Sequence, residues 1–360
     1  MRTRTLTLIT GCLLFLVSIP ASAQLLNLPR GSQMATVSQR VGITDITITY
    51  SRPGVKGREI WGKLVPYGMN NLGFGTATAA PWRAGANENT TIEFTDDVKV
   101  EGRDVKAGIY GLHMEIREDG TAAVILSRNS SSWGSFFYDE SEDALRVNVT
   151  TKEAPHHELL TFEFNTVDAT SAVASLIWGK KEIPFKIEVP VTAIVIRDIK
   201  ERLRTTPGFS RQTWEQAANF ALNNGGDLND ALQWINNAIE GQFYSEKTAN
   251  NLAIKATILD KMGQKEEGYK LIDEAAAIAN TNQLNALGYR MLNAKEYDRA
   301  LKFFKMNVKN NPDNANVYDS LGEAYKTMGD KRNAIKSLKK ALSLNPPANV
   351  RANSVKLLKE

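Results

Sequence analysis

The feature that most constrains this 360-residue chain is a set of landmarks that recur every 34 residues near its C-terminus. Three kinds of landmark keep this step: Leu287-Gly288 and Leu321-Gly322, Ala300 and Ala334, and Pro312 and Pro346. Such a period predicts stacked helix pairs, because a single pair cannot bury its apolar face alone. Small residues let two helices approach closely, and a proline ends each pair. The C-terminal part is therefore predicted to be a helical repeat array.

Weaker versions of the pattern precede these two regular pairs, with loops of more variable length. We expect four helix pairs over residues 211–360, the last followed by a capping helix around Val350 to Lys359. The regular pairs resemble tetratricopeptide repeats. The resemblance implies an α-solenoid in which the first helix of each pair lines a concave groove that recognises a protein or peptide. On that basis the groove should carry Asn282, Asn285, Tyr289, Asn293, Asn316, Asp319, Glu323 and Lys326. The alternative is an array that only packs against the rest of the chain.

The N-terminal part has the period of strands rather than helices. Ile46, Ile48 and Tyr50 alternate with threonines, and similar alternation recurs up to Val189, before Pro190. Short strands separated by turn residues, without helical segments between them, predict an antiparallel β-sandwich or barrel. The predicted organisation is a signal peptide at 1–23, a β-sandwich domain at 24–190, a linker helix at 191–210 and the repeats at 211–360.

Two long irregular segments interrupt the strands, and they hold the candidate ligand-binding side chains. Ordered loops on a sheet scaffold often carry binding residues. The mixture of aromatic rings, arginines and carboxylates suits a small polar, planar or sugar-like ligand. Alternatively the aromatic rings plug the open end of the sandwich, and Arg83 pairs with Glu88. The candidates are Arg52, Arg58, Trp82, Arg83, Asn87, Glu88, His113, Tyr138 and Asp139.

Motifs in these loops resemble a family of exported bacterial proteins, the domain of unknown function 2911. The matching motifs are Tyr50-Ser51-Arg52-Pro53, Leu64-Val65-Pro66-Tyr67-Gly68, the stretch from Trp82 to Glu88, Trp133-Gly134 and Tyr138-Asp139. The resemblance covers roughly Gln39 to Val189. It implies a β-sandwich and no particular activity, because the family has no established one. The insertion from Met69 to Pro81 departs from many relatives.

The N-terminus has the pattern of a secretory signal. Arg2 and Arg4 precede an apolar run up to Ile19, and Ala21-Ser22-Ala23 provides a small-residue cleavage site. We therefore expect a chain that begins at Gln24 after export to the periplasm or the medium, with membrane contact only through the signal. Cys12, the single cysteine, lies inside the apolar run, so a lipid anchor there is the less favoured alternative.

Composition restricts the chemistry. The formal net charge is +4, and the basic excess lies on the repeats, where we interpret it as solvated helix faces rather than a nucleic-acid surface. Three histidines and no mature cysteine give no metal cluster, and we expect no cofactor. We assign no catalytic residue. The predicted function is a non-enzymatic binding or scaffold protein that acts through its repeats. The alternative is a hydrolase or carbohydrate-processing enzyme that uses Glu88, His113 or Asp139 beside Arg83.

Overall fold

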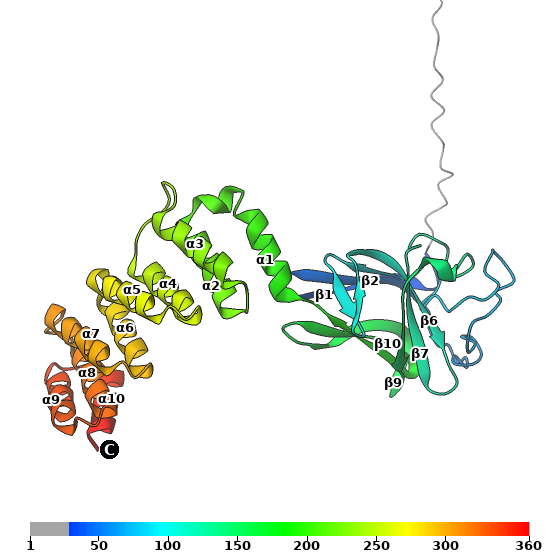
Figure 1. The fold of residues 1–360 in the computed structure, drawn as a ribbon. Coiled ribbons are helices and arrows are strands. Elements are labelled where there is room, and N and C mark those ends of the chain that lie inside the picture. Colours follow the sequence, from blue (N-terminus) through cyan, green and yellow to red (C-terminus); the bar gives the residue numbers. More distant parts are fainter. Residues whose placement is uncertain (1–28, 360) are drawn as a thin grey trace, which may run out of the picture.

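The computed structural model describes residues 29–359, which form a β-domain followed by an array of helices (Figure 1). The predicted order, an antiparallel β-sandwich and then a tetratricopeptide-type solenoid, is confirmed. The predicted signal peptide and Cys12 lie outside the described residues. None of the described helices is long and apolar enough to cross a membrane.

The β-domain consists of two antiparallel sheets. The first has the order β1-β2-β3-β6-β7-β8 and the second β5-β4-β10-β9. The strands are β1 (Gln33–Val41), β2 (Thr44–Arg52), β3 (Thr91–Phe94), β4 (Val98–Val100), β5 (Arg103–Val105), β6 (Gly108–Ile116), β7 (Thr121–Ser127), β8 (Asp143–Thr150), β9 (Lys152–Val167) and β10 (Ser171–Glu188). A short 3-10 helix, η1 (Glu140–Glu142), precedes β8.

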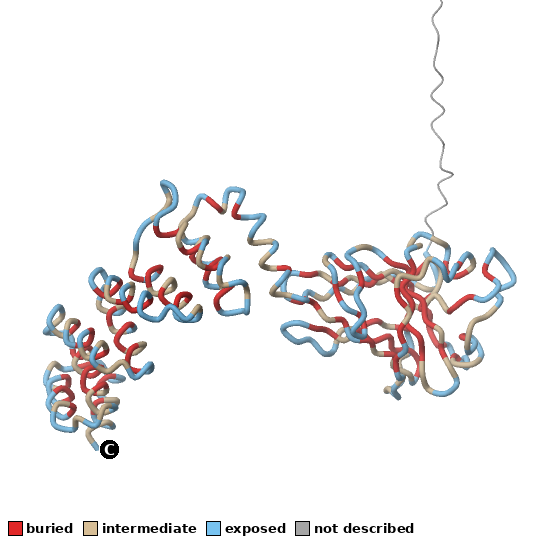
Figure 2. The backbone as a smooth tube through the Cα atoms, viewed as in Figure 1, coloured by how far each residue is buried: buried red, intermediate tan, exposed pale blue. Residues whose placement is uncertain are grey.

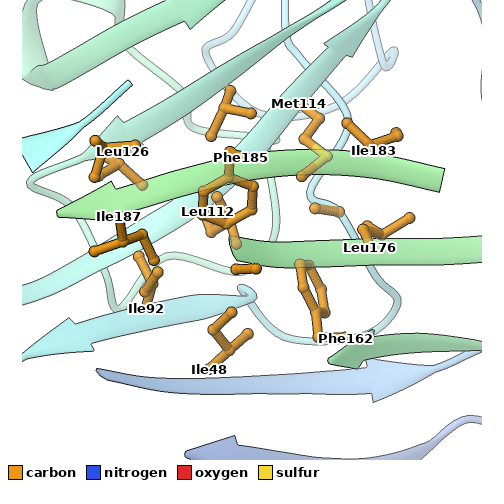
Figure 3. Packing of buried hydrophobic residues seen from close by; sticks show 14 of the residues in the cluster. Ile48, Ile92, Leu112, Met114, Leu126, Phe162, Leu176, Ile183, Phe185 and Ile187 are labelled. Atoms are coloured by element: carbon orange, nitrogen blue, oxygen red, sulfur yellow. The ribbon is translucent and has the colours of Figure 1, made fainter. Parts of the chain in front are cut away.

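The core lies between the two sheets, as the period of two requires. Ile48, Leu112 and Leu126 of the first sheet meet Phe162 and Phe185 of the second, and all five are buried (Figure 3). Figure 2 shows buried runs on the facing sides of the sheets and exposed residues in the connecting loops. Apolar burial on this scale is the main stabilising contribution to such a domain.

Strand β10 bends back on itself at Gly179, where the backbone φ is +60°. The amide of Val189 thereby reaches the carbonyl of Thr170 at 2.8 Å, and the hydroxyl of Ser175 donates to Glu182 at 2.6 Å. The bend places Trp178 beside the long loop that follows β2.

Helix α1 (Val191–Arg202) contacts both parts of the molecule. Ile194 is buried in the sandwich core, with Val191 packed beside it. Ile196 and Ile199 instead pack against the core of the helical array. Since residues i and i+3 or i+4 of a helix share a face and i+2 does not, a single helix can serve two cores in this way.

Four helix pairs and a final helix form the array, as predicted. They are α2 (Arg211–Asn223) with α3 (Leu228–Glu240), α4 (Ala249–Lys261) with α5 (Lys265–Ile278), α6 (Thr281–Asn293) with α7 (Tyr297–Asn310), α8 (Ala315–Thr327) with α9 (Lys331–Ser343), and α10 (Ala348–Lys359). A second 3-10 helix, η2 (Thr206–Phe209), leads into α2.

The recurring landmarks Gly288 and Gly322 have a direct steric cause in the two regular pairs. A Cβ atom on Gly288 would lie 2.7 Å from the ring of Phe304, and one on Gly322 would lie 2.6 Å from Leu338. The first and second helices of each pair therefore meet where glycine leaves room for a large side chain.

Candidate functional site

A pocket of about 420 Å³ lies at the end of the sandwich remote from α1. The turn between β1 and β2 touches α1 through Gly42 and Val191, so the opposite end of β2 points away from the helices (Figure 1). The loop after β2 surrounds the pocket there, and Trp178 of β10 completes it from the second sheet. Four predicted ligand-binding residues line it: Arg58, Trp82, Arg83 and Asn87.

Trp82 and Trp178 form the aromatic wall of this pocket, and Trp61 packs against both of them. Trp82 exchanges two backbone hydrogen bonds with Met114 of β6, at 2.9 and 2.8 Å, which attaches its loop to the first sheet. Its ring stacks on Trp178 with centroids 6.0 Å apart and planes 15° apart, and Trp61 meets both rings edge-on. Trp178 was missed in the sequence because its partners lie about 100 positions away; the only local signal was an aromatic ring just before the turn glycine.

The guanidinium of Arg83 is held by its surroundings rather than by a carboxylate. Its Nη1 donates to the carbonyl of Asn87 at 2.5 Å, and its charge lies 4.9 Å from the ring centroid of Phe136. A Cβ on Gly134 would lie 2.2 Å from the guanidinium, which explains the glycine of the Trp133-Gly134 motif. Burial lowers the pKa of Arg83. The expected pair of Arg83 with Glu88 is wrong, because Glu88 pairs with Arg30.

Arg52 and Arg58 have different roles. Arg52 donates to the carbonyl of Leu160 at 2.9 Å and to the hydroxyl of Thr161 at 2.7 Å, so it joins the end of β2 to β9. Arg58 donates to two carbonyls of its own loop, those of Gly54 and Val55, and lines the pocket. Arg52 is a structural contact between sheets, whereas Arg58 is available at the pocket.

His113 lies on the outer side of β6, buried beneath the loops that cross the first sheet. Its Nδ1 is 2.9 Å from the hydroxyl of Ser135, which also lines the pocket. Burial, with a smaller contribution from the charge of Arg83, lowers the pKa of His113 to about 4. The imidazole is therefore neutral at pH 7 and bonded to a neutral hydroxyl. Among the described residues there is no group of His, Cys, Asp or Glu that could hold a metal ion.

Tyr138 and Asp139 do not line the pocket. The hydroxyl of Tyr138 donates to Asp143 at 2.8 Å and accepts from Arg146 at 2.7 Å, and burial raises its pKa. Its ring covers Ile125 on the outer face of the first sheet. Asp139 is exposed and accepts from the amide of Ser141 at the start of η1. The aromatic loop residues thus divide into a plug around Tyr138 and a pocket wall around Trp82.

The second candidate site is the face formed by the first helices of the repeats. Of the eight predicted groove residues, Asn282 and Asn293 are exposed, and Asn285 and Asn316 are half-buried. Tyr289 donates to Glu323 at 2.8 Å, which links α6 to α8. Burial raises the pKa of Tyr289.

Asp319 and Lys326 connect α8 to the final helix. Asp319 is buried and accepts hydrogen bonds from Asn353, at 2.8 Å, and from Ser354. Lys326 donates to the carbonyl of Leu357 at 2.9 Å. This corrects the expectation of an open surface at Asp319: α10 covers it, because the capping helix occupies the place of a further first helix.

Sequence reasoning missed amides earlier in the array. Gln212, Asn219 and Asn223 of α2 and Asn250 of α4 are exposed on first helices. The spacing of Gln212, Asn219 and Asn223 repeats that of Asn282, Tyr289 and Asn293, so they lie along one face of α2. An amide-rich stripe therefore begins at the first pair rather than at the third.

Comparison with known proteins agrees with both parts of the fold. Residues 32–187 match the family described as protein of unknown function (DUF2911), and residues 315–347, which span α8 and α9, match the tetratricopeptide repeat model. No curated protein matches the chain.

Several solved structures are similar to the chain. The crystal structure of MamA has 21% identity and a TM-score of 0.32, with 43% of this chain and 89% of that chain covered. YrrB, titled a TPR protein with an unusual peptide-binding site, has 16% identity and a TM-score of 0.32, with 46% and 84% covered. The C-terminal part of a TPR repeat-containing protein from Cytophaga hutchinsonii has 17% identity and a TM-score of 0.35, with 47% and 67% covered. The chain thus has an N-terminal segment that matches the DUF2911 family, followed by C-terminal tetratricopeptide repeats.

Proposed function

We propose that this protein is an exported, non-enzymatic binding or scaffold protein whose helical repeats recognise a protein or peptide partner. The observation that carries the proposal is the array itself: four helix pairs, one of which matches the tetratricopeptide repeat model, with exposed amides on the first helices of the first three pairs. Asparagine and glutamine side chains both donate and accept, so a row of them suits an extended peptide backbone. The partner's sequence stays open in this proposal.

The link through α1 supports a scaffold rather than two independent domains. Ile194 is buried in the sandwich core while Ile199 packs on the repeats, and Arg197 pairs with Asp96 beside β4. A partner bound to the repeats would therefore be held at a defined position relative to the sandwich.

The hydrolase alternative receives less support. Glycoside hydrolysis uses two carboxylates that flank the scissile bond. Within the described part of the chain, the residues that line the sandwich pocket include neither Asp nor Glu. The three residues of this alternative already have partners: Glu88 pairs with Arg30, His113 bonds to Ser135, and Asp139 accepts from the amide of Ser141.

Site-specific photo-crosslinking in the full-length protein tests the repeat surface. A photoreactive residue would replace Asn282 or Asn293 on α6, and matched probes would replace the exposed Lys305 and Lys309 on α7. We expect one partner to crosslink from both α6 positions. Each crosslink should weaken when the other position carries glutamate, that is, Asn293→Glu for the probe at 282 and Asn282→Glu for the probe at 293. Equal crosslinking from α7, or no crosslinking from α6, would refute recognition by this face.

Export has a separate test. Cells that express the full chain would be fractionated, and the N-terminus of the recovered protein sequenced. We expect the protein in the periplasm or medium with Gln24 as its first residue. An uncleaved chain in the cytoplasm would contradict this part of the proposal without affecting the repeats.

A further inference from the structure

We propose that the sandwich pocket binds a small sugar that carries an anionic group, either a carboxylate or a phosphate. This site is independent of the partner surface on the repeats, since it lies on the other domain and at its far end. The pocket combines positive side chains, an aromatic wall and an unsatisfied hydrogen-bond donor.

The charged side chains that line the pocket are both positive. Arg58 and Arg83 both line it, and in the described part of the chain neither makes an ion pair with a carboxylate. A guanidinium has five N–H donors, and the Arg83 side chain donates one hydrogen bond, to the carbonyl of Asn87. A buried charge is costly unless it is paired. A ligand carboxylate or phosphate would supply the partner, and arginine recognises both geometries.

The aromatic wall provides a flat apolar surface beside these charges. Trp82 is half-buried and stacks on the fully buried Trp178, so the stack is fixed and the outer ring remains partly accessible. Leu64 and Pro66 extend the apolar lining. A pocket with an aromatic wall and a few placed polar groups is the usual form of a small-molecule site. The flat face of a sugar ring would pack on Trp82 while its acidic substituent meets the arginines.

One buried donor of the wall, and a second on the tryptophan packed against it, lack partners. The indole Nε1 atoms of Trp61 and Trp178 are buried and make no hydrogen bond within the described structure. Buried polar atoms are normally satisfied, and an indole N–H can only donate. Among the described residues that line the pocket, the charged side chains, Arg58 and Arg83, and the one unsatisfied side-chain atom, Trp178 Nε1, are all donors. This favours a ligand rich in acceptor oxygens over a neutral or cationic one. The volume of about 420 Å³ is near the lower end of ligand pockets, which suits a single sugar ring.

The test is a titration of the full-length protein, followed by tryptophan fluorescence and calorimetry. The probes are glucuronate, galacturonate and N-acetylneuraminate as carboxylates, glucose 6-phosphate as the phosphate, and glucose, galactose and inorganic phosphate as controls. We expect at least one anionic sugar to change the fluorescence and to bind at least about 10-fold more tightly than its neutral parent. Binding should weaken as salt increases. The carboxylate and phosphate probes then identify which oxyanion the site prefers.

Variants connect the binding to the pocket. Arg58→Gln and Arg83→Gln should each weaken it by about 10-fold or more, and Arg103→Gln, an exposed arginine on β5, should leave it unchanged. Circular dichroism checks that each variant is folded. If Arg83→Gln disturbs the fold, the Arg58→Gln variant decides the test, because Arg58 is exposed and its replacement leaves the core intact. The proposal is overturned if no anionic sugar binds at about 10 mM. It is also overturned if neutral sugars or inorganic phosphate bind equally well, or if the Arg58 variant binds normally.

Discussion

Replacement of Gly288 by alanine tests the steric explanation of the repeat most directly. Glycine in the middle of a helix is normally unfavourable, and Gly→Ala at an open helical position stabilises by about 1 kcal/mol. Here the added Cβ would lie 2.7, 2.8 and 2.9 Å from three atoms of the Phe304 ring. That ring is fully buried and meets Tyr289 edge-on at 5.1 Å, so it has little room to move.

The expected free-energy change follows from two opposed contributions. Overpacking of a core costs about 1–3 kcal/mol. The gain in helix propensity offsets about 1 kcal/mol of this. We therefore expect Gly288→Ala to destabilise the α6–α7 pair by about 1 kcal/mol. When Phe304 is first replaced by leucine, the same substitution should stabilise by about 1 kcal/mol, which gives a coupling of about 2 kcal/mol between the two positions.

Native-state hydrogen exchange of the full-length protein measures these effects locally, from the amides of α6 and α7. The matched control is Ala286→Gly, an exposed position on the same helix, which measures the backbone contribution alone. If Gly288→Ala increases protection by the amount that Ala286→Gly removes, with or without Phe304, then the ring does not pack against Gly288 and the steric explanation is refuted.

Three further predictions concern other contacts. Asp319→Ala removes the acceptor of two hydrogen bonds from α10, so we expect faster exchange throughout α10, while Asp313→Ala at an exposed position leaves it unchanged. Ile194→Ala should cost about 2–5 kcal/mol in the sandwich and open the α1 segment to protease, whereas Ala193→Ser, exposed on the same helix, should do neither. The pKa of His113 is lowered from 6.5 to about 4, so the unfolded chain binds the proton first as pH falls. Stability should be full above pH 6.5 and fall by about 3 kcal/mol by pH 4, and urea unfolding of His113→Gln should lack this part of the slope.

The repeat array could be predicted in detail because its signals are local. The 34-residue step, the glycines and the prolines are all read within one helix pair, and the structure has the expected four pairs and capping helix. The strands were readable for the same reason, from alternation at residues such as Ile46 and Ile48. The pattern could not indicate that Asp319 lies beneath α10. A residue on the surface of α8 becomes buried only when another helix packs over it.

The candidate site was predicted in part. Trp82, Arg83 and Asn87 form one motif, and they do meet at one pocket. Trp178 reaches the pocket only because β10 bends, so that its ring stacks on Trp82. Arg52 does not line the pocket, because its guanidinium donates to β9. His113 was a ligand-binding candidate, and the loop that carries Ser135 buries it. Each of these outcomes depends on segments far apart in the sequence.

The sequence alone determined the two fold classes, their order and the residue types at the helix contacts, because hydrophobic period and chain-breaking residues act over a few positions. The tertiary structure alone decided which loop side chains share a pocket, which charges stay unpaired and which repeat residues remain open. The physical reason is that pairing, desolvation and burial depend on distances between segments, and such distances exist only once the chain has folded. The 34-residue step thus predicts a solenoid, while the packing of its helices selects the surface that it can offer to a partner.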